Sequence, residues 1–182
     1  MKIEQEIYDG SLIHNRFAYT FFKDMTLATG NIVAFRAPAK VETEFMIDQE
    51  DLVNNDFIYS DDMIHFCYEL PCTDLFGGVC FQRLFCSYIG DILSKVMDAP
   101  VTVEGDDIFV TKEFTQGGIV QQRGKASVSI VGEKNGAILG HTGINVKAGK
   151  HAPAFAFSTE MDDNRCAAFQ SIVMETFYKT TQ

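Results

Sequence analysis

The sequence has no tryptophan, only four prolines, and no run of lysines and arginines. Its 15 basic residues are outnumbered by 25 acidic ones, which gives a formal net charge of -10. Such a charge repels phosphate backbones, so we expect no sequence-independent binding to nucleic acid. No apolar run approaches the roughly 20 residues needed to cross a bilayer, and acids occupy the early positions where a signal peptide is apolar. These absences predict a cytoplasmic protein without a membrane partner.

The five cysteines form no C-x-x-C pair. An odd number of cysteines in a reducing compartment favours free thiols, and free cysteine is most often a buried structural residue. We therefore expect no disulfide.

No internal repeat, low-complexity tract or Pro/Gly-rich linker divides the chain. The 46% hydrophobic fraction is that of a globular protein, and 182 residues can bury a sizeable core. We expect residues 1–182 to form a single domain.

Apolar periodicity predicts an α+β fold with a mixed, largely antiparallel sheet packed by helices. The long helix should follow a cap at Thr73 or Asp74, and a closing helix should start near Thr159, where Asp162 completes a capping-box pattern. "MIDQEDLVNND" is expected to be a short helix or turn. The predicted strands are "NIVAFR", "DDMIHFCYEL", "VTVE", "DIFVT", "GIVQQR", "ASVSIV" and "AILGHTGINVK".

Two of these strands should form a hairpin whose polar residues share one face. With the turn centred near Lys134, the polar odd positions face away from a core of even apolar positions. Gly143 then lies opposite Lys125 and leaves room for a ligand beside the backbone. The clustered residues are Lys125, Ser127, His141 and Asn145. The same pattern also describes an ordinary solvated sheet face, and that alternative stays open.

Other polar residues fit a ligand site less specifically. Arg36 ends an apolar strand and could clamp a carboxylate or phosphate, or form a surface ion pair. His65 and Glu69 are four residues apart, and on a strand that is about 13 Å, too far to chelate one ion alone. Paired acids at residues 61–62 and 106–107 could supply oxygen ligands, but such pairs are usually turn formers, and no metal site is expected.

The order "GDDIFV", "KASVSI" and "HTGINV" resembles the biotin and lipoate protein ligases. Their catalytic domains carry a strand with an aspartate, then a lysine that opens a strand, then a G-I-N-V strand. The whole chain, including "YDGSLIHNRFAY" and "FRAPAKVETEFMIDQEDL", is more similar to the domain of unknown function 366 family. These resemblances imply an α+β fold shared with class II aminoacyl-tRNA synthetases.

The ligase resemblance also implies a chemistry. The lysine matching Lys125 contacts the substrate carboxylate and the nearby phosphate while an acyl-adenylate forms, which makes Lys125 the candidate catalytic residue and ATP the implied cosubstrate. An ammonium suits that role because it neutralises charge on carboxylate and phosphate oxygens. The candidate ligand-binding residues are Asp107, His141, Gly143, Asn145, Arg36 and His65.

Two functions stay open. The first is an enzyme that activates or transfers a small carboxylate or acyl group. The second is a non-catalytic small-molecule binding protein that has lost nucleotide chemistry, which is favoured by the acidic "SDDMIHFCYELP" where the ligases carry an Arg/Gly-rich loop. A homo-oligomer is compatible with either.

Overall fold

A computed structural model describes residues 7–14, 16–18, 30–43, 46, 53, 57–71, 74–115 and 119–181. Its strands form two antiparallel sheets, one of order β1-β2-β7-β6 and one of order β3-β4-β5. The elements, in chain order, are η1 (Ser11–His14), β1 (Asn31–Val41), β2 (Ile58–Leu70), α3 (Leu75–Met97), β3 (Val101–Glu104), β4 (Asp107–Thr115), β5 (Ile119–Lys125), β6 (Ser127–Lys134), β7 (Ala137–Lys147) and α4 (Asp163–Thr181).

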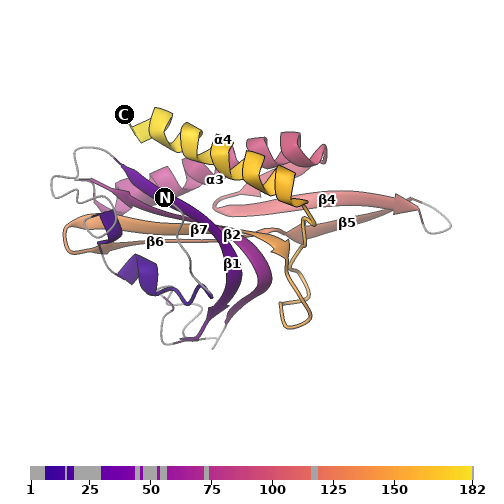
Figure 1. The fold of residues 1–182 in the computed structure, drawn as a ribbon, viewed down its shortest axis with the longest axis horizontal. Helices are drawn as coiled ribbons and strands as arrows, with labels where there is room; N and C mark the ends of the chain where they lie inside the picture. The colour runs from indigo at the N-terminus through magenta and orange to yellow at the C-terminus, as the bar shows by residue number, and fades with distance from the viewer. Residues whose placement is uncertain are drawn as a thin grey trace.

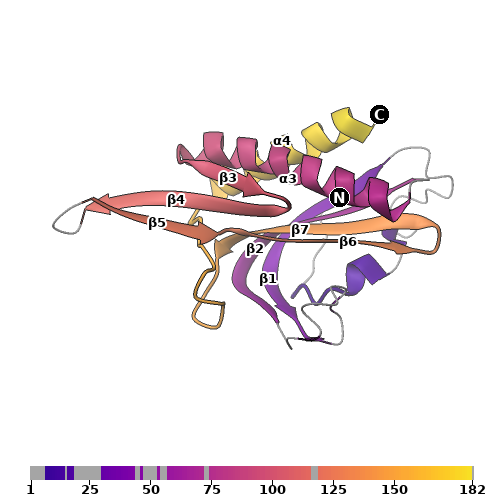
Figure 2. The same cartoon turned by 180° about the vertical axis from the view of Figure 1, so that it is seen from behind.

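The two long helices cover one face of the four-stranded sheet, and the short η1 lies on the other face (Figure 1). The β4–β5 ribbon projects beyond the helices, which the opposite view also shows (Figure 2). Every predicted strand is present, so the α+β prediction with a largely antiparallel sheet is confirmed. The segment "MIDQEDLVNND" falls mostly outside the described residues.

The central strands β2 and β7 are buried on both faces. Even positions such as Phe66 and Ile144 face the helices and join the main core, which includes Phe85, Phe169 and Phe177. On the other face, Cys67 and Leu139 belong to a second core with residues of β1 and the N-terminal segment, including Tyr8 and Phe35. Odd-numbered side chains of β2 and β7 are therefore buried in this second core.

Helix α3 begins where the sequence predicts. The Asp74 carboxylate accepts a hydrogen bond of 2.8 Å from the Gly77 backbone N–H, as an N-cap does. At the other end Asp98 adopts a left-handed conformation and closes the helix. Leu84 of α3 is 43% exposed, whereas Leu93 is fully buried.

Helix α4 begins at Asp163, later than expected near Thr159. The Thr159 hydroxyl donates to the Asn145 carbonyl oxygen at 2.8 Å, so it caps no helix. The cap is Asp162, whose carboxylate accepts from the Arg165 N–H at 2.9 Å. Phe169, Val173 and Phe177 are buried, whereas Ile172 is 43% exposed.

The register predicted for the β6–β7 hairpin is wrong. The turn residues are Asn135 and Gly136, both with positive φ, and Lys134 pairs with Ala137. Asn-Gly is the preferred dipeptide for a two-residue turn in which both residues need positive φ. Val128 therefore lies opposite Gly143 and Ile130 opposite His141, so odd β6 residues pair with even β7 residues. Lys125 belongs to β5 and pairs with Phe109 of β4.

The described thiols, those of Cys67, Cys80, Cys86 and Cys166, are free, as expected, while Cys72 lies outside the described residues. Among the helices of the described chain, none has the length and apolar character needed to span a bilayer.

Candidate functional site

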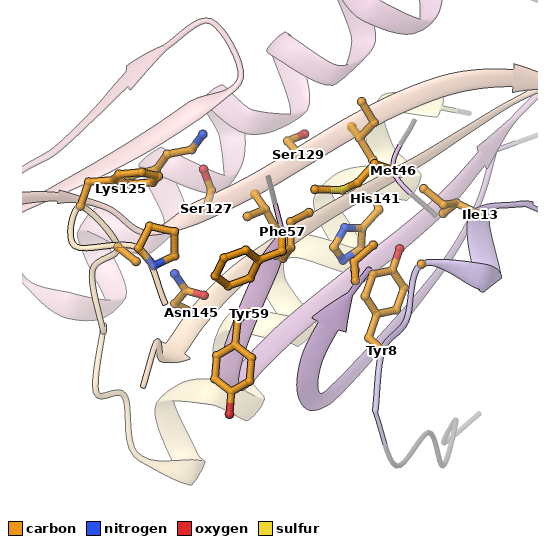
Figure 3. A pocket seen from close by; sticks show the side chains of 18 residues that line it. Tyr8, Ile13, Met46, Phe57, Tyr59, Lys125, Ser127, Ser129, His141 and Asn145 are labelled. Carbon is orange, nitrogen blue, oxygen red and sulfur yellow. The ribbon is translucent and has the colours of Figure 1, made fainter. Parts of the chain in front are cut away.

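A cavity of about 420 Å³ lies on the sheet face opposite the long helices. Figure 3 shows Lys125 and Asn145 toward one end of it and His141 and Tyr8 toward the other. Its apolar lining comes from β1, β2, β6, the N-terminal segment and the loop before α4, and it includes Ile13, Val41, Met46, Ile58, Val128, Ile130 and Phe155. The size and the mixture of an apolar lining with few polar groups are those of a small-molecule pocket.

Backbone hydrogen bonds fix the end that holds Lys125. The Lys125 N–H donates to the Phe155 carbonyl at 2.9 Å, and the Lys125 carbonyl accepts from the Phe157 N–H at 2.8 Å. The next residue, Ala126, donates to Ile108 of β4 and accepts from Asn145 of β7, both at 2.8 Å. The two sheets therefore meet at Ala126, which places Lys125 and Asn145 beside each other.

The Lys125 ammonium pairs with the Asp107 carboxylate at 2.6 Å. The side chains are 27% and 37% exposed, so the pair is partly solvated and contributes only about 0.2–1 kcal/mol to stability. An ammonium has three N–H donors, and this ion pair occupies one of them. Lys125 can therefore bind a second anionic oxygen without leaving Asp107.

The Asn145 carboxamide is 4% exposed, and its Oδ1 is buried without a hydrogen-bond partner among the described residues. The Asn145 backbone, in contrast, is well hydrogen-bonded. Its carbonyl oxygen accepts from both the N–H and the hydroxyl of Thr159. An unpartnered buried polar group costs about 1–3 kcal/mol. Asn145 lines the cavity, but its Oδ1 can only accept a hydrogen bond, so the donors for an anion at this end are N–H groups such as those of the Lys125 ammonium.

His141 lines the cavity and contacts His65 behind it. The His65 Nδ1 and His141 Nε2 atoms are 3.0 Å apart, and His65 Nε2 lies 3.0 Å from the Ala37 carbonyl oxygen. Burial lowers the pKa of His65 to about 4 and lowers the pKa of His141 well below its ordinary range. Both rings are therefore neutral at physiological pH.

Tyr8 covers the histidine pair. Its ring stacks on His141 with centroids 4.3 Å apart and lies 4.6 Å from the ring of His65. Burial raises the pKa of Tyr8, and the adjacent Cys67 thiol, to which it is hydrogen-bonded, raises it further. Figure 3 shows Tyr8 and His141 side by side. This packing fixes the plane of the His141 ring.

Of the predicted ligand-binding residues, His141 and Asn145 line the cavity, whereas Asp107, His65, Gly143 and Arg36 do not. Gly143 leaves no open space, because a Cβ there would meet the Met63 Sδ at 2.3 Å and Val128 Cγ2 at 3.0 Å. The expectation of a free approach beside Gly143 is therefore wrong: the Met63 side chain fills it. The Arg36 guanidinium donates to Asp62 and Asp163 at 2.6–2.8 Å, so it forms the ion pair that was the alternative.

The paired acids hydrogen-bond to protein side chains. Asp106 accepts from Gln82 at 3.0 Å, and Asp61 from the Tyr59 hydroxyl at 3.0 Å. Glu69 forms an ion pair with Arg16. The sequence did not predict a shared metal ion for Glu69 and His65. Within the described ranges no group of three or more His, Cys, Asp or Glu residues could hold a metal ion.

Residues outside the hairpin, which its sequence pattern does not indicate, also line the cavity. Tyr8 and Phe57 are far from the hairpin in sequence, and Phe155 follows it. Phe57 is 53% and Phe155 63% exposed, which is unusual for phenylalanine. Nothing in local periodicity indicates these contacts, although the Asn-Gly turn could have given the correct register.

Comparison with known proteins identifies the family. The model of the Domain of unknown function (DUF366) matches residues 1–182. This chain belongs to that family, as the sequence resemblance implied. A solved structure described as a protein of unknown function from Pyrococcus horikoshi has a TM-score of 0.73 at 27% identity, with 97% of this chain and 91% of that one covered. No curated protein matches.

More distant solved structures show the fold. P. falciparum LipL1 in complex with lipoate has a TM-score of 0.52 at 11% identity, covering 96% of this chain and 60% of that one. Biotin protein ligase from Aquifex aeolicus, in complex with biotin and ATP, has a TM-score of 0.50 at 12% identity, covering 96% and 70%. The chain thus spans roughly two thirds of the length of these proteins. Its α+β fold is that of the biotin/lipoate ligases, which is class II synthetase-like.

Proposed function

We propose that the cavity binds a small carboxylate or acyl compound. Lys125 contacts the carboxylate of the ligand, and Asn145 lies beside Lys125. The observation that carries the proposal is an ammonium with spare N–H donors, beside the Asn145 carboxamide, at one end of a largely apolar cavity of about 420 Å³. A carboxylate matches the polar end and a hydrocarbon body matches the rest.

Electrostatics supports an anion at this end. The Asp107 carboxylate neutralises part of the Lys125 charge. Because both side chains are partly exposed, solvent screens and weakens this ion pair. A ligand carboxylate that reaches Lys125 gains a charge-assisted hydrogen bond, which is about twice as strong as a neutral one. Apolar rims at Phe57 and Phe155 favour a ligand whose tail is uncharged.

The ligands of the distant structural relatives agree with this class. Lipoate is bound by LipL1, and biotin by the Aquifex protein. Both ligands are small carboxylic acids with a compact body. For the present chain they support the ligand class and identify no particular ligand.

Titration calorimetry with octanoic acid and octanamide tests the proposal. The two probes share a tail and differ only at the polar end, so the wild-type protein should bind the acid more tightly. Equal affinities for the two, or no binding of either, would contradict a carboxylate site.

Activation of the bound acid with ATP is a second candidate function. It is favoured by Lys125, which stands at the position that the ligase resemblance gives to the lysine contacting carboxylate and phosphate, and which keeps N–H donors unused. ATP–pyrophosphate exchange in the presence of carboxylic acids tests it. Exchange that depends on an acid and disappears in Lys125→Ala would support activation, whereas binding without exchange would leave the protein as a non-catalytic binder.

A further inference from the structure

The histidine pair at the other end of the cavity defines a second polar contact for the ligand. His65 is fully buried and His141 is 2% exposed, and only His141 lines the cavity. Their hydrogen bonds form a chain from the backbone of β1, through β2, to β7. The direction of these hydrogen bonds decides whether the His141 nitrogen that has no partner in the pair is a hydrogen-bond donor or an acceptor.

The backbone fixes the proton positions. A carbonyl oxygen can only accept, so the Ala37 oxygen requires a proton on His65 Nε2. In a neutral ring the second nitrogen is then bare, so His65 Nδ1 is an acceptor. The bond between the rings therefore needs a proton on His141 Nε2, and His141 Nδ1 is left as a bare lone pair.

The opposite arrangement would require a charged His65. Only a ring protonated at both nitrogens could donate to Ala37 and to His141 together. Burial opposes that charge, because it lowers the pKa of His65 to about 4. Phe35 packs on His65 with ring centroids 4.8 Å apart, and Tyr8 packs on both histidine rings.

No group of the described chain donates a hydrogen bond to His141 Nδ1, although the residue is almost completely buried. We propose that His141 Nδ1 accepts a hydrogen bond from the ligand, so that the acid bound here carries a hydroxyl or N–H donor along its chain, away from the carboxylate. His141 then determines specificity, and His65 is a positioning residue that fixes its tautomer. The inference rests on the proposed carboxylate site and narrows its ligand class.

Nitrogen-15 spectra of the histidine rings test the proton positions without any ligand. In the wild type at neutral pH, His141 should show a protonated Nε2 and a bare Nδ1, and His65 the same tautomer. His65→Phe removes the hydrogen bond that fixes the His141 tautomer, so His141 should populate both tautomers in that variant. A wild-type His141 that carries its proton on Nδ1 would overturn the inference.

Matched ligands test the recognition. Unbranched acids of six to ten carbons are compared with ω-hydroxy and ω-methoxy acids, because the methoxy group keeps the oxygen and loses the donor. At the length that reaches His141, the hydroxy acid should bind about 3- to 10-fold more tightly than the methoxy acid, the usual range for one neutral hydrogen bond. The preference should disappear in His141→Phe, which keeps a ring of similar shape, while affinity for the plain acid persists.

The outcomes separate the two proposals. Binding of plain acids with no hydroxy preference at any length overturns the donor inference and keeps the carboxylate site. A preference that persists in His141→Phe overturns the inference as well. Failure of every acid to bind contradicts both proposals.

Discussion

The Lys125 ammonium lies 2.6 Å from the Asp107 carboxylate, at the junction of the two sheets and at one end of the cavity. The β4–β5 pairing places Lys125 opposite Phe109, and the hydrogen bond between Ala126 and Ile108 joins the two sheets beside it. This ion pair is internal to the protein and partly solvated. It therefore sets how strongly Lys125 can attract a ligand anion.

Replacing Lys125 by alanine should weaken octanoate binding by about 1.5–3 kcal/mol, the range for hydrogen bonds to charged groups, and leave octanamide almost unaffected. Asp107→Asn should strengthen octanoate binding, because it removes the competing negative charge. Calorimetric titration measures both. Lys112→Ala is the matched control, since Lys112 pairs with Glu160 outside the cavity, and it should bind both probes as the wild type does. Equal loss of acid and amide affinity in Lys125→Ala would point to a packing role.

Removing the Asn145 amide should separate stability from binding. Asn145→Leu replaces an unpartnered buried carboxamide by an apolar group of similar size, so the free energy of unfolding should stay unchanged or rise by about 1 kcal/mol. Octanoate affinity should fall, because the substitution also removes the amide N–H donors beside Lys125, whereas Oδ1 can only accept. Denaturant unfolding gives the first quantity and calorimetry the second.

Thr159→Val serves as the contrasting variant, because it removes a hydroxyl that is hydrogen-bonded to the Asn145 carbonyl. It should lower the free energy of unfolding by about 1 kcal/mol. A loss of stability in Asn145→Leu as large as in Thr159→Val would show that the amide has a structural partner.

The histidine pair should make stability depend on pH. Because the pKa of His65 is lowered from 6.5 to about 4, the unfolded chain binds protons in that interval that the folded chain does not. Stability is then fully present above about pH 6.5 and falls as the pH drops toward 4, by about 3 kcal/mol from His65 alone, and His141 adds in the same direction.

Denaturant unfolding between pH 4 and 7.5 measures this dependence, and the double variant His65→Phe/His141→Phe should show a shallower slope. The control is His151→Gln, whose histidine is exposed, and it should keep the wild-type slope. An identical slope in the double variant and the wild type would contradict the neutral, buried pair.

Two glycines of β7 should tolerate alanine differently. At Gly140 an added Cβ would meet the Tyr68 ring at 2.1 Å, and at Gly143 it would meet the Met63 Sδ at 2.3 Å. The aromatic ring is fixed in the core, whereas a methionine end can move. Both variants should be destabilised, by about 1–3 kcal/mol at Gly143 and by more at Gly140.

Met63→Ala should rescue Gly143→Ala, and a double-mutant cycle on denaturant unfolding measures the coupling. Additive effects of the two substitutions would show that Met63 does not fill the space beside Gly143.

The strands and helices could be predicted because their signals are local. Alternation over "DDMIHFCYEL" and the Asp74 cap each depend on neighbouring residues, and both elements formed as expected. The face shared by His141 and Asn145 was also predictable, since both are odd positions of one strand.

The register and the cavity walls were harder to predict. Register depends on the two turn residues, and moving the turn past Lys134 to Asn135 and Gly136 changed every β6 partner. The partner of His141 comes from β2, and its cover, Tyr8, comes from more than 100 residues earlier. Such contacts are set by tertiary packing, which local periodicity does not encode.

A crystal structure of the protein soaked with octanoic acid tests the carboxylate site most directly. The proposed function predicts the fatty acid inside the cavity, with a carboxylate oxygen within about 3 Å of the Lys125 Nζ and the tail against the apolar wall. An empty cavity at saturating octanoic acid, or a carboxylate bound away from Lys125, would contradict it.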